Sequence, residues 1–349
     1  MGGFNPSYPV PPAEAGKITL AHGSGGIPSA ELIGKLFLPA LNNKYLELLH
    51  DGSTFELDNS KLAFTTDSFV VKPIFFPGGD IGSLSVHGTV NDLAMCGARP
   101  LLLSLSFIIE EGLVMADLGR IVESISRACR EAGVMVVTGD TKVVEKGSAD
   151  RIYINTSGVG VVEYEGISPR AVRPGDSIIL NGEIGLHGIA VMVAREGLNL
   201  EAEIESDSAP LWGPVEKVLK SGAAIHCLRD ATRGGLSSVL NEIARAADVG
   251  IQIREDSIPV PEPVRGACEI LGLDPLYIAN EGRFLTFVAP NDNGEDKAIE
   301  TLRSHPLGRE ARKIGQVTDD HKGTVILKTS IGGRRVVPMA SGELLPRIC

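Results

Sequence analysis

Five aspartates lie in short motifs that end a predicted strand or occupy a glycine-containing turn. They are Asp51 in HDGS, Asp67 in TTDSFVV, Asp92 in VNDLAMCGA, Asp140 in TGDTK and Asp230 in RDATRGG. Each one alone could be an ordinary turn or cap residue, and Asp230 could cap a helix that begins near Gly234. Taken together, they supply the hard oxygen ligands that Mg²⁺ prefers when it also binds phosphates. We therefore expect several of these carboxylates to hold magnesium, and we assign that role to Asp51, Asp92 and Asp230.

The rest of a nucleotide site has to come from backbone groups. The chain contains neither a GxxxxGK[ST] phosphate loop nor a dinucleotide-binding glycine fingerprint after a first strand. The segment 21–26, AHGSGG, could offer free N–H groups to phosphate oxygens, although a solvent-exposed loop would have the same composition. The expected ATP-binding residues are His22, Gly23, Gly25, Gly26, Asp51, Asp67, Asp92, Gly139, Asp140 and Thr141.

A cysteine is the last residue of this sequence. Cys349 follows an aperiodic stretch that starts at Val337, so we expect a flexible tail that carries a thiol between an inside site and an outside partner. Tethering would give that thiol a high effective concentration at the site. An accidental, exposed and inert cysteine is the alternative. The other cysteines are scattered and form no CxxC pair, so we expect neither disulfides nor zinc, and we expect Cys96, Cys129 and Cys268 to be small buried side chains.

Composition limits the classes of function. A length of 349 residues favours two domains, and a net charge of −11 argues against nucleic-acid binding. The start of the chain lacks the features of a signal peptide, and the most apolar stretch, 101–109, is shorter than the ~20 residues of a membrane span. We expect a cytoplasmic protein that does not interact with membranes.

Hydrophobic periodicity predicts an α+β fold with two domains. A proline-rich arm (1–16) precedes an N-terminal domain (17–164), a C-terminal α/β domain (165–336) and the tail (337–349). In the first domain we predict strands at 61–73, 100–109 and 151–162, a short buried strand at 134–137, and helices at 80–96 and 117–132. In the second we predict strands at 177–180, 250–254, 283–288 and 324–328, and helices at 186–195, 214–220, 236–247 and 295–304.

Seven motifs together resemble a known family. They are HGSGG (22–26), TTDSFVV (65–71), VNDLAMCGA (90–98), TGDTKVV (138–144), DATRGG (230–235), NEGR (280–283) and PRIC (346–349). The set closely resembles the HypE family of hydrogenase maturation factors, within the PurM-like superfamily of aminoimidazole ribonucleotide synthetase, selenophosphate synthetase and thiamine-monophosphate kinase. The acidic motifs are shared across that superfamily and indicate ATP and Mg²⁺. PRIC, together with TGDTK and NEGR, indicates this one family.

The resemblance implies a reaction and its partners. Proteins of the HypE family receive a carbamoyl group on the C-terminal cysteine from the carbamoyltransferase HypF. They use ATP to dehydrate the S-carboxamide to a thiocyanate, whose cyanide passes to the HypC–HypD complex and then to the iron of [NiFe]-hydrogenase. The PurM-like fold implies an N-terminal domain that dimerises by joining sheets, with ATP near the interface and a C-terminal domain over the site.

Dehydration of a carboxamide requires that its oxygen become a leaving group and that its nitrogen lose protons. Phosphorylation by ATP achieves the first, and we expect Lys142 and Glu281 to position the amide on Cys349 and transfer its protons. An ordinary ion pair between domains is the alternative for Lys142 and Glu281. Two other functions stay open at this point: phosphorylation of a diffusible small molecule, and a non-catalytic carrier whose acidic cluster is structural.

Overall fold

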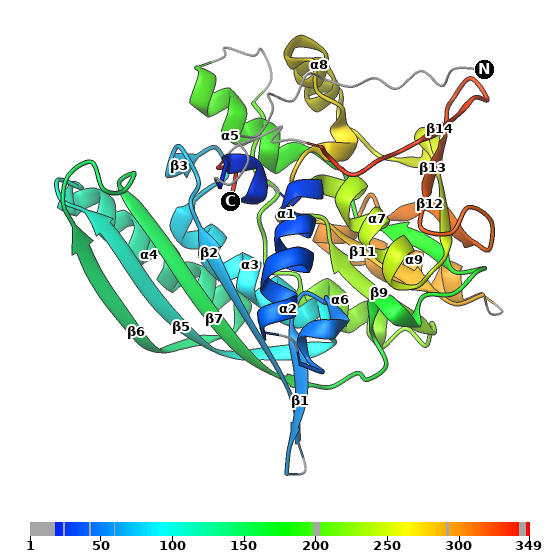
Figure 1. Ribbon diagram of the computed structural model, residues 1–349, viewed down its shortest axis with the longest axis horizontal. Helices are drawn as coiled ribbons and strands as arrows, with labels where there is room; N and C mark the ends of the chain where they lie inside the picture. Colours follow the sequence, from blue (N-terminus) through cyan, green and yellow to red (C-terminus); the bar gives the residue numbers. More distant parts are fainter. Residues whose placement is uncertain are drawn as a thin grey trace.

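The computed structural model describes residues 18–23, 25–41, 43–58, 60–197, 203–290, 293–341 and 347–349. The proline-rich arm predicted at 1–16 lies outside these residues. The described chain forms two sheets with helices packed on them, which confirms the α+β class (Figure 1). Within the described residues, no helix is long and apolar enough to cross a membrane.

The first sheet belongs to the N-terminal part of the chain. Its strands, in order across the sheet, are β1 (Ser53–Leu57), β2 (Ser60–Phe69), β7 (Ile152–Val162), β5 (Ala98–Glu110) and β6 (Met135–Val144). Neighbouring strands are antiparallel except β5 and β6, which are parallel. A small hairpin of β3 (Phe75–Phe76) and β4 (Gly79–Asp80) leads into the helices.

Helices α3 (Ile81–Met95) and α4 (Met115–Ala132) pack beside this sheet. Asp80 caps α3, because its carboxylate accepts hydrogen bonds from the backbone N–H groups of Gly82 and Ser83. The helices predicted at 80–96 and 117–132 are therefore confirmed, with ends shifted by one or two residues. Most of α3 is buried, so the helix is held on all sides and can place a side chain accurately.

Strand β6 differs from its prediction. A short buried strand was expected at 134–137, but β6 runs to Val144 and its side chains are exposed along nearly its whole length. Met135 and Val143 expose 65% and 66% of their surface. The prediction of burial is wrong because β6 lies at the edge of the sheet and pairs only with β5. An edge strand with apolar side chains is a surface ready for pairing.

The second sheet contains seven strands. In order across the sheet they are β14 (Arg334–Val336), β13 (Val325–Lys328), β10 (Gly250–Arg254), β12 (Arg312–Thr318), β8 (Ser177–Leu180), β11 (Phe284–Val288) and β9 (Ile225–Asp230). The helices of this part are α5 (Leu186–Glu196), α6 (Trp212–Leu219), α7 (Gly235–Ala246), α8 (Glu262–Leu271) and α9 (Gly294–Arg303). Short 3₁₀ helices are η4 (Pro169–Ala171), η5 (Glu255–Ser257), η6 (Pro275–Tyr277) and η7 (Pro306–Gly308).

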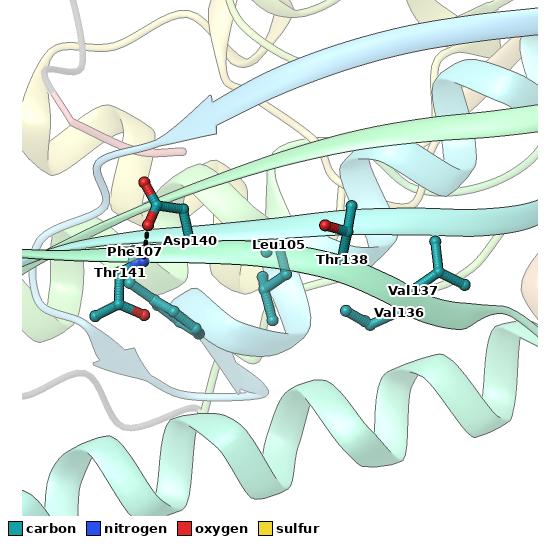
Figure 2. A pocket seen from close by; sticks show the side chains of 8 residues that line it. Leu105, Phe107, Val136, Val137, Thr138, Asp140 and Thr141 are labelled. Carbon is teal, nitrogen blue, oxygen red and sulfur yellow. Dashed lines mark hydrogen bonds between the residues drawn. The ribbon is translucent and has the colours of Figure 1, made fainter.

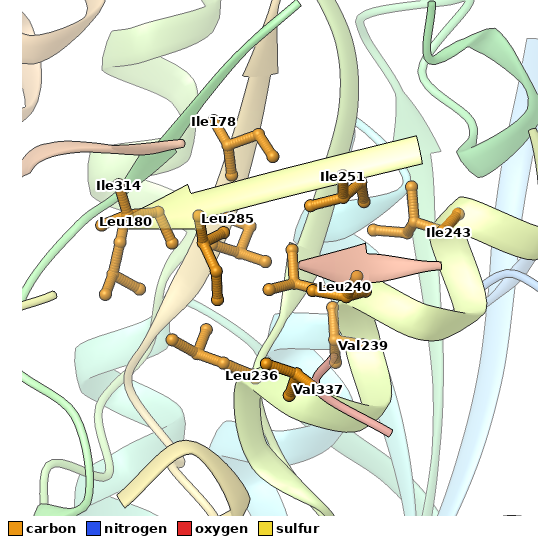
Figure 3. Close-up of a cluster of buried hydrophobic side chains, with 14 of the residues drawn as sticks. Ile178, Leu180, Leu236, Val239, Leu240, Ile243, Ile251, Leu285, Ile314 and Val337 are labelled. Atoms are coloured by element: carbon orange, nitrogen blue, oxygen red, sulfur yellow. The ribbon is translucent and has the colours of Figure 1, made fainter. Parts of the chain in front are cut away.

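The core of this second part forms between α7 and the sheet. Leu236, Leu240 and Ile243 from one face of α7 meet side chains of the strands such as Ile251 and Leu285 (Figure 3). The predicted apolar stripe of this helix is confirmed. Because α7 is fixed on the sheet, the loop that joins it to β9 has a defined position.

The segment before β1 is mostly helical. It comprises η1 (Leu20–Gly23), α1 (Ile27–Leu32), the π-helical turn η2 (Ile33–Phe37), α2 (Leu38–Leu41) and η3 (Leu46–Leu48). Helices α1 and α2 run across the front of the molecule in the view of Figure 1. The first part of this segment lies close to the tail. The backbone N–H of Ile27 donates a hydrogen bond to the carbonyl oxygen of Ala340, with an N–O distance of 2.9 Å.

The tail is more closely packed than predicted. Among its described residues, Val337, Met339, Ala340 and Ile348 are buried. Asn241 on α7 donates to the carbonyl of Val337 over 2.8 Å, so the tail starts inside the core of the second part. In Figure 1 the C-terminus lies between β3 and α5. The stretch from Val337 was expected to be a flexible tail, but the apolar side chains of these described residues occupy buried positions instead.

Candidate active site

Three carboxylates from distant parts of the sequence converge. Asp51 precedes β1, Asp92 lies in the last turn of α3, and Asp230 ends β9. One ligand oxygen from each lies within 4.8 Å of the others. Asp230 does not cap α7, because the N-cap residue is Gly234 and makes no side-chain cap hydrogen bond. The structure thus brings together the three residues predicted as magnesium ligands.

Neighbouring side chains fix the orientation of these carboxylates. The Thr65 hydroxyl lies 2.7 Å from Oδ2 of Asp92 and 2.9 Å from the carbonyl oxygen of Asp51. Nε of Arg229 lies 2.7 Å from Oδ1 of Asp51, and its Nη2 lies 2.8 Å from Glu242. Partners that orient ligands in this way are typical of metal sites.

The electrostatics of the cluster favour a cation. Burial, followed by the neighbouring carboxylates, raises the pKa of Asp92 and of Asp230 well above the ordinary value. Burial also raises the pKa of Asp67 to about 6, although the guanidinium of Arg233 opposes this. Among the described residues, Oδ2 of Asp51 is buried without a hydrogen-bond donor. Hard oxygen donors with excess negative charge fit a divalent cation such as Mg²⁺.

Cys349 reaches the edge of this cluster. Burial raises the pKa of its thiol well above the ordinary value, and the carboxylate of Glu281 beside it acts in the same direction. The guanidinium of Arg233 opposes that shift and has its strongest charge interaction with Cys349. The site therefore places a nucleophilic sulfur, an acid and a cation next to the carboxylate cluster.

Glu281 has the environment of a proton acceptor. Its side chain is buried, and burial followed by the charges of Asp230 and Asp207 raises its pKa well above the ordinary value. Within the described part of the chain, Oε1 of Glu281 has no hydrogen-bond partner. A carboxylate with a raised pKa is a stronger base than an ordinary one, and an open acceptor atom lets it take a proton from a neighbouring group.

Two residues that the sequence analysis missed hold Glu281 in place. The carboxylate of Asp207 accepts hydrogen bonds from the backbone N–H groups of Glu281 and Gly282, and both N–O distances are 3.2 Å. The Asn91 amide donates to the carbonyl of Glu281 over 3.2 Å. Asn91 precedes Asp92 in a motif already singled out, so it could have been found. Asp207 belongs to no recognised motif, so nothing in the sequence indicated that it would contact Glu281.

The glycine-rich segment lies over Arg233. This residue belongs to the DATRGG motif, but the sequence analysis did not predict it as a site residue. Nη1 of Arg233 donates to the carbonyl of Gly23 over 3.2 Å. Gly25 has a φ of +76° and packs so closely on the backbone of Arg233 that a side chain would not fit. Gly26 packs on Ala340 of the tail. His22 turns back to its own segment, with Nδ1 2.9 Å from the Thr19 hydroxyl.

The TGDTK motif lies apart from the cluster in a single chain. Lys142 is 67% exposed on β6, and its Nζ lies 2.5 Å from Asp140. Asp140 accepts from the N–H of Thr141 and lies on the opposite face of the sheet from Phe107 (Figure 2). Gly139 is on the same strand. The structure thus leaves Gly139, Asp140, Thr141 and Lys142 on the outer edge of the sheet.

The expected Lys142–Glu281 pair is not formed within one chain. β6 is three strands away from β2, which carries Asp67 of the cluster. That separation amounts to roughly 14 Å at the usual strand spacing. Within one chain Lys142 therefore pairs with Asp140 and not with Glu281, because β6 occupies the outer edge of the sheet, and a role for Lys142 beside Glu281 stays a prediction.

Comparison with known proteins gives consistent matches along the chain. Residues 49–162 match the N-terminal domain of AIR synthase related protein, and residues 173–328 match its C-terminal domain. Carbamoyl dehydratase HypE of Azotobacter vinelandii is 53% identical over 335 residues, covering 96% of this chain and 98% of that protein.

Two solved structures extend the comparison. The HypE–HypF complex contains a chain that is 49% identical, with a TM-score of 0.83, and the match covers 88% of this chain and 99% of that one. HypE in complex with ATP is 47% identical, with a TM-score of 0.80, and the match covers 95% of this chain and 100% of the other.

Proposed function

This chain belongs to the HypE family of AIR synthase related proteins, and from that membership we propose that it uses ATP to dehydrate an S-carboxamide on its own Cys349 to a thiocyanate. The observation that supports this most directly is the position of Cys349 beside Glu281 and Arg233, at the edge of the carboxylate cluster. The substrate is thus part of the enzyme. Residues 17–164 form the ATP-binding and dimerising domain, 165–336 the covering domain, and 337–349 the substrate tail.

The reaction balances with one ATP. The carboxamide oxygen attacks the γ-phosphorus, the bond to the β-phosphate oxygen breaks, and ADP leaves. The amide nitrogen loses a proton in forming the O-phosphorylated imidate. Loss of a second N–H proton and departure of phosphate then create the C≡N bond. Glu281 accepts a nitrogen proton, since a raised pKa makes its carboxylate a stronger base and its Oε1 is open.

The other site residues bind and orient ATP. Asp51, Asp92 and Asp230 would hold Mg²⁺, which supplies charge neutralisation at the transferring phosphoryl group. Asp67 and the described glycine-rich residues His22, Gly23, Gly25 and Gly26 would contribute to the nucleotide site, and Arg233 would supply positive charge there beside Cys349. These residues would hold Cys349 and the nucleotide in the same site, as the transfer requires.

A second copy of the chain completes the proposal. Strand β6 presents an open apolar edge, which we assign to a homodimer made by joining the first sheets. Gly139, Asp140, Thr141 and Lys142 would then serve ATP or Glu281 of the partner subunit. This arrangement accounts for an exposed Lys142 that does not reach Glu281 in its own chain.

The external partners follow from the chemistry of the sulfur. A HypE–HypF complex is among the solved structures, so we assign the donation of the carbamoyl group to a HypF-type transferase. The HypC–HypD complex would accept the cyanide for the iron of [NiFe]-hydrogenase, in the cytoplasm where ATP is available. A small-molecule kinase or a passive carrier is less favoured, because neither gives a role to both Cys349 and the carboxylate cluster.

One mass measurement tests the proposal. The full-length protein is incubated with HypF, carbamoyl phosphate, ATP and Mg²⁺, and the peptide that ends at Cys349 is analysed over time. The expected series is an unmodified peptide, a carbamoylated peptide, and then a peptide that has lost one water. A peptide that stays carbamoylated in the presence of ATP would refute dehydration. Modification at another cysteine would refute the assignment to Cys349.

A further inference from the structure

The metal ligand Asp92 and the base Glu281 belong to different parts of the chain. Asp92 lies on α3 beside the first sheet, whereas Glu281 lies in the turn before β11 of the second sheet. In the proposed reaction the phosphoryl group and the base act on the same amide, so the ligand and the base must keep a defined separation. One side chain connects the two directly.

Asn91 joins α3 to the turn that carries Glu281. Its Nδ2 donates hydrogen bonds to the carbonyl oxygens of Ala209 and Glu281, with N–O distances of 3.1 Å and 3.2 Å. Its Oδ1 accepts from the backbone N–H of Leu211, with an N–O distance of 2.8 Å. The side chain is buried, so any other position would leave buried backbone groups without partners. Asn91 thus holds both Glu281 and the segment 207–211 in place.

The segment 207–211 is fastened at two further points. Asp207 accepts the backbone N–H of Glu281, as described above. On α3, Nδ1 of His87 lies 3.0 Å from the hydroxyl of Ser208. His87 precedes Asn91 by four residues, so both side chains lie on one face of the helix. Helix, segment and Glu281 therefore form a closed ring of hydrogen bonds, in which no member can move alone.

Asp92 follows Asn91 in the last turn of the same helix. Consecutive residues of an α-helix point about 100° apart, so one side chain reaches the carboxylate cluster while the other reaches the second part of the chain. Helix α3 is capped by Asp80 and buried along most of its length. A displacement of its last turn therefore moves Asn91 and Asp92 together.

We propose that Asn91 is a positioning residue that fixes Glu281 relative to Asp92, so that nucleotide binding at the carboxylates also sets the base in place. The purpose of this link rests on the proposed function, whereas the link itself is a property of the ATP site. Without Asn91, the γ-phosphoryl group still reaches the amide oxygen, but the second N–H proton is removed slowly. Water then attacks the O-phosphorylated imidate, which returns the carboxamide and releases phosphate. ATP is hydrolysed and no thiocyanate forms.

The ratio of ADP formed to water lost from the C-terminal peptide tests this consequence. Carbamoylated full-length protein is mixed with ATP and Mg²⁺, ADP is measured by chromatography, and the peptide is measured by mass spectrometry. Wild type should form about one ADP for each water lost. Asn91→Leu, which keeps the approximate size but makes no hydrogen bond, should raise the ratio to at least about five, because a small misplacement can slow a positioned step by about 100-fold. A ratio of about one in Asn91→Leu would overturn the proposal.

Asn241 on α7 provides a matched control. It is buried, and its Nδ2 donates to the carbonyl oxygens of Ser237 and Val337, both with N–O distances of 2.8 Å. Asn241→Leu therefore removes the same kind of buried hydrogen bonds and should lower stability in the same way. Its ratio of ADP to water lost should stay at about one, even if both rates fall. An increase equal to that of Asn91→Leu would mean general loosening and would refute a specific role of Asn91.

Hydrogen exchange tests the link without HypF, carbamoylation or dehydration. In wild type, Mg²⁺ with ATP should slow amide exchange in peptides that cover 89–96 and 279–284, each by at least about threefold. In Asn91→Leu, and in Asn91→Asp, whose carboxylate cannot donate to the two carbonyls, only 89–96 should be slowed. Asn241→Leu should behave as wild type.

Two results of the exchange experiment would overturn the proposal. One is a 279–284 peptide that Mg²⁺ and ATP slow equally in wild type and in the Asn91 variants. The other is a wild-type 279–284 peptide whose exchange stays unchanged while that of 89–96 slows, and this arm needs no variant to fold. Failure of the proposed function is recognised separately, because wild type would then bind ATP and show the exchange pattern without losing water from its C-terminal peptide.

Discussion

The hydroxyl of Thr65 lies 2.7 Å from Oδ2 of Asp92, and it also contacts the carbonyl oxygen of Asp51. One side chain thus orients two parts of the carboxylate cluster. We expect Thr65→Val to weaken ATP binding in the presence of Mg²⁺ by about tenfold, as loss of a ligand-orienting partner usually does. Titration calorimetry measures this. Thr66→Val is the matched control, since Thr66 is exposed and bonds Thr156 instead; equal affinities for both variants would contradict this role of Thr65.

Asp92→Asn should act in opposite directions on stability and on binding. Burial and neighbouring carboxylates penalise the charge of Asp92, so the amide should raise the melting temperature of the metal-free protein. The same change removes a charged ligand and should weaken ATP binding with Mg²⁺. Thermal denaturation in EDTA and calorimetry with Mg²⁺ test the two halves. A variant that loses stability and keeps its affinity would exclude Asp92 as a ligand.

The metal-free protein should be more stable at mildly acidic pH. Burial raises the pKa of Asp67 from 3.8 to about 6, and that of Asp92, Asp230 and Glu281 in the same direction. The folded state then binds more protons than the unfolded state between these values, so stability falls as pH rises through about 6. Melting curves in EDTA from about pH 5 to about pH 8 should show the decline. Mg²⁺ should oppose it, because the cation binds the ionised cluster. Constant stability over this range in EDTA would contradict the charge arrangement.

Glu281→Gln should separate binding from chemistry. An amide cannot accept the nitrogen proton, so dehydration should slow by at least about 100-fold while ATP binding and carbamoylation persist. Time courses of the C-terminal peptide mass should then stop at the carbamoylated form. Dehydration at the wild-type rate would remove Glu281 from the chemistry.

Mixed dimers test whether Lys142 acts across the dimer. Lys142→Ala and Glu281→Gln should each be inactive alone. In a mixed dimer, the Glu281→Gln chain keeps its Lys142 and supplies it to the intact Glu281 of the other chain, so one of two sites should recover. Recovery to about half of wild-type activity per mixed dimer is expected. No recovery, in dimers verified by mass, would place both residues in one chain or make the Lys142 contribution structural.

The two ends of the tail should differ in their effect on stability. Val337 is fully buried against α7, so Val337→Ala should cost about 2 kcal/mol of unfolding free energy. Deletion of Cys349 removes a partly buried residue at the edge of the core and should change stability by less than about 0.5 kcal/mol. Urea denaturation measures both. Equal effects would mean that the tail does not start inside the core.

The carboxylate triad could be predicted because short sequence motifs are enough to identify its three residues. Asp51, Asp92 and Asp230 each lie in a short motif next to the end of an element, and strand and helix ends gather at one edge of a fold. The helices with clear apolar stripes, α4 and α7, were predicted for a similar reason. Strands β9 and β12 were missed, because IHCLRD and RKIGQVT mix charged and apolar residues without a clear alternation.

The position of Lys142 could not be predicted, because it depends on the order of strands. Nothing within TGDTK indicates that β6 lies at the edge and pairs only with β5. The apolar residues of β6 were read as core, although an edge that awaits a second copy has the same composition. Asp207 was missed for a related reason: its role comes from the distant turn at Glu281, with which its own sequence shares no pattern.

The hydrogen bond between Ile27 and Ala340 limits how far Cys349 can travel. With Ala340 held at the glycine-rich segment, nine residues follow it in the sequence, and a fully extended chain of that length spans at most roughly 30 Å. A carbamoyl donor must therefore bring its catalytic centre inside a sphere of that radius around Ala340. The same radius applies to the acceptor of the cyanide. The length of the tether thus sets an upper limit on the distance between the catalytic centres of donor and acceptor when each is bound to this protein.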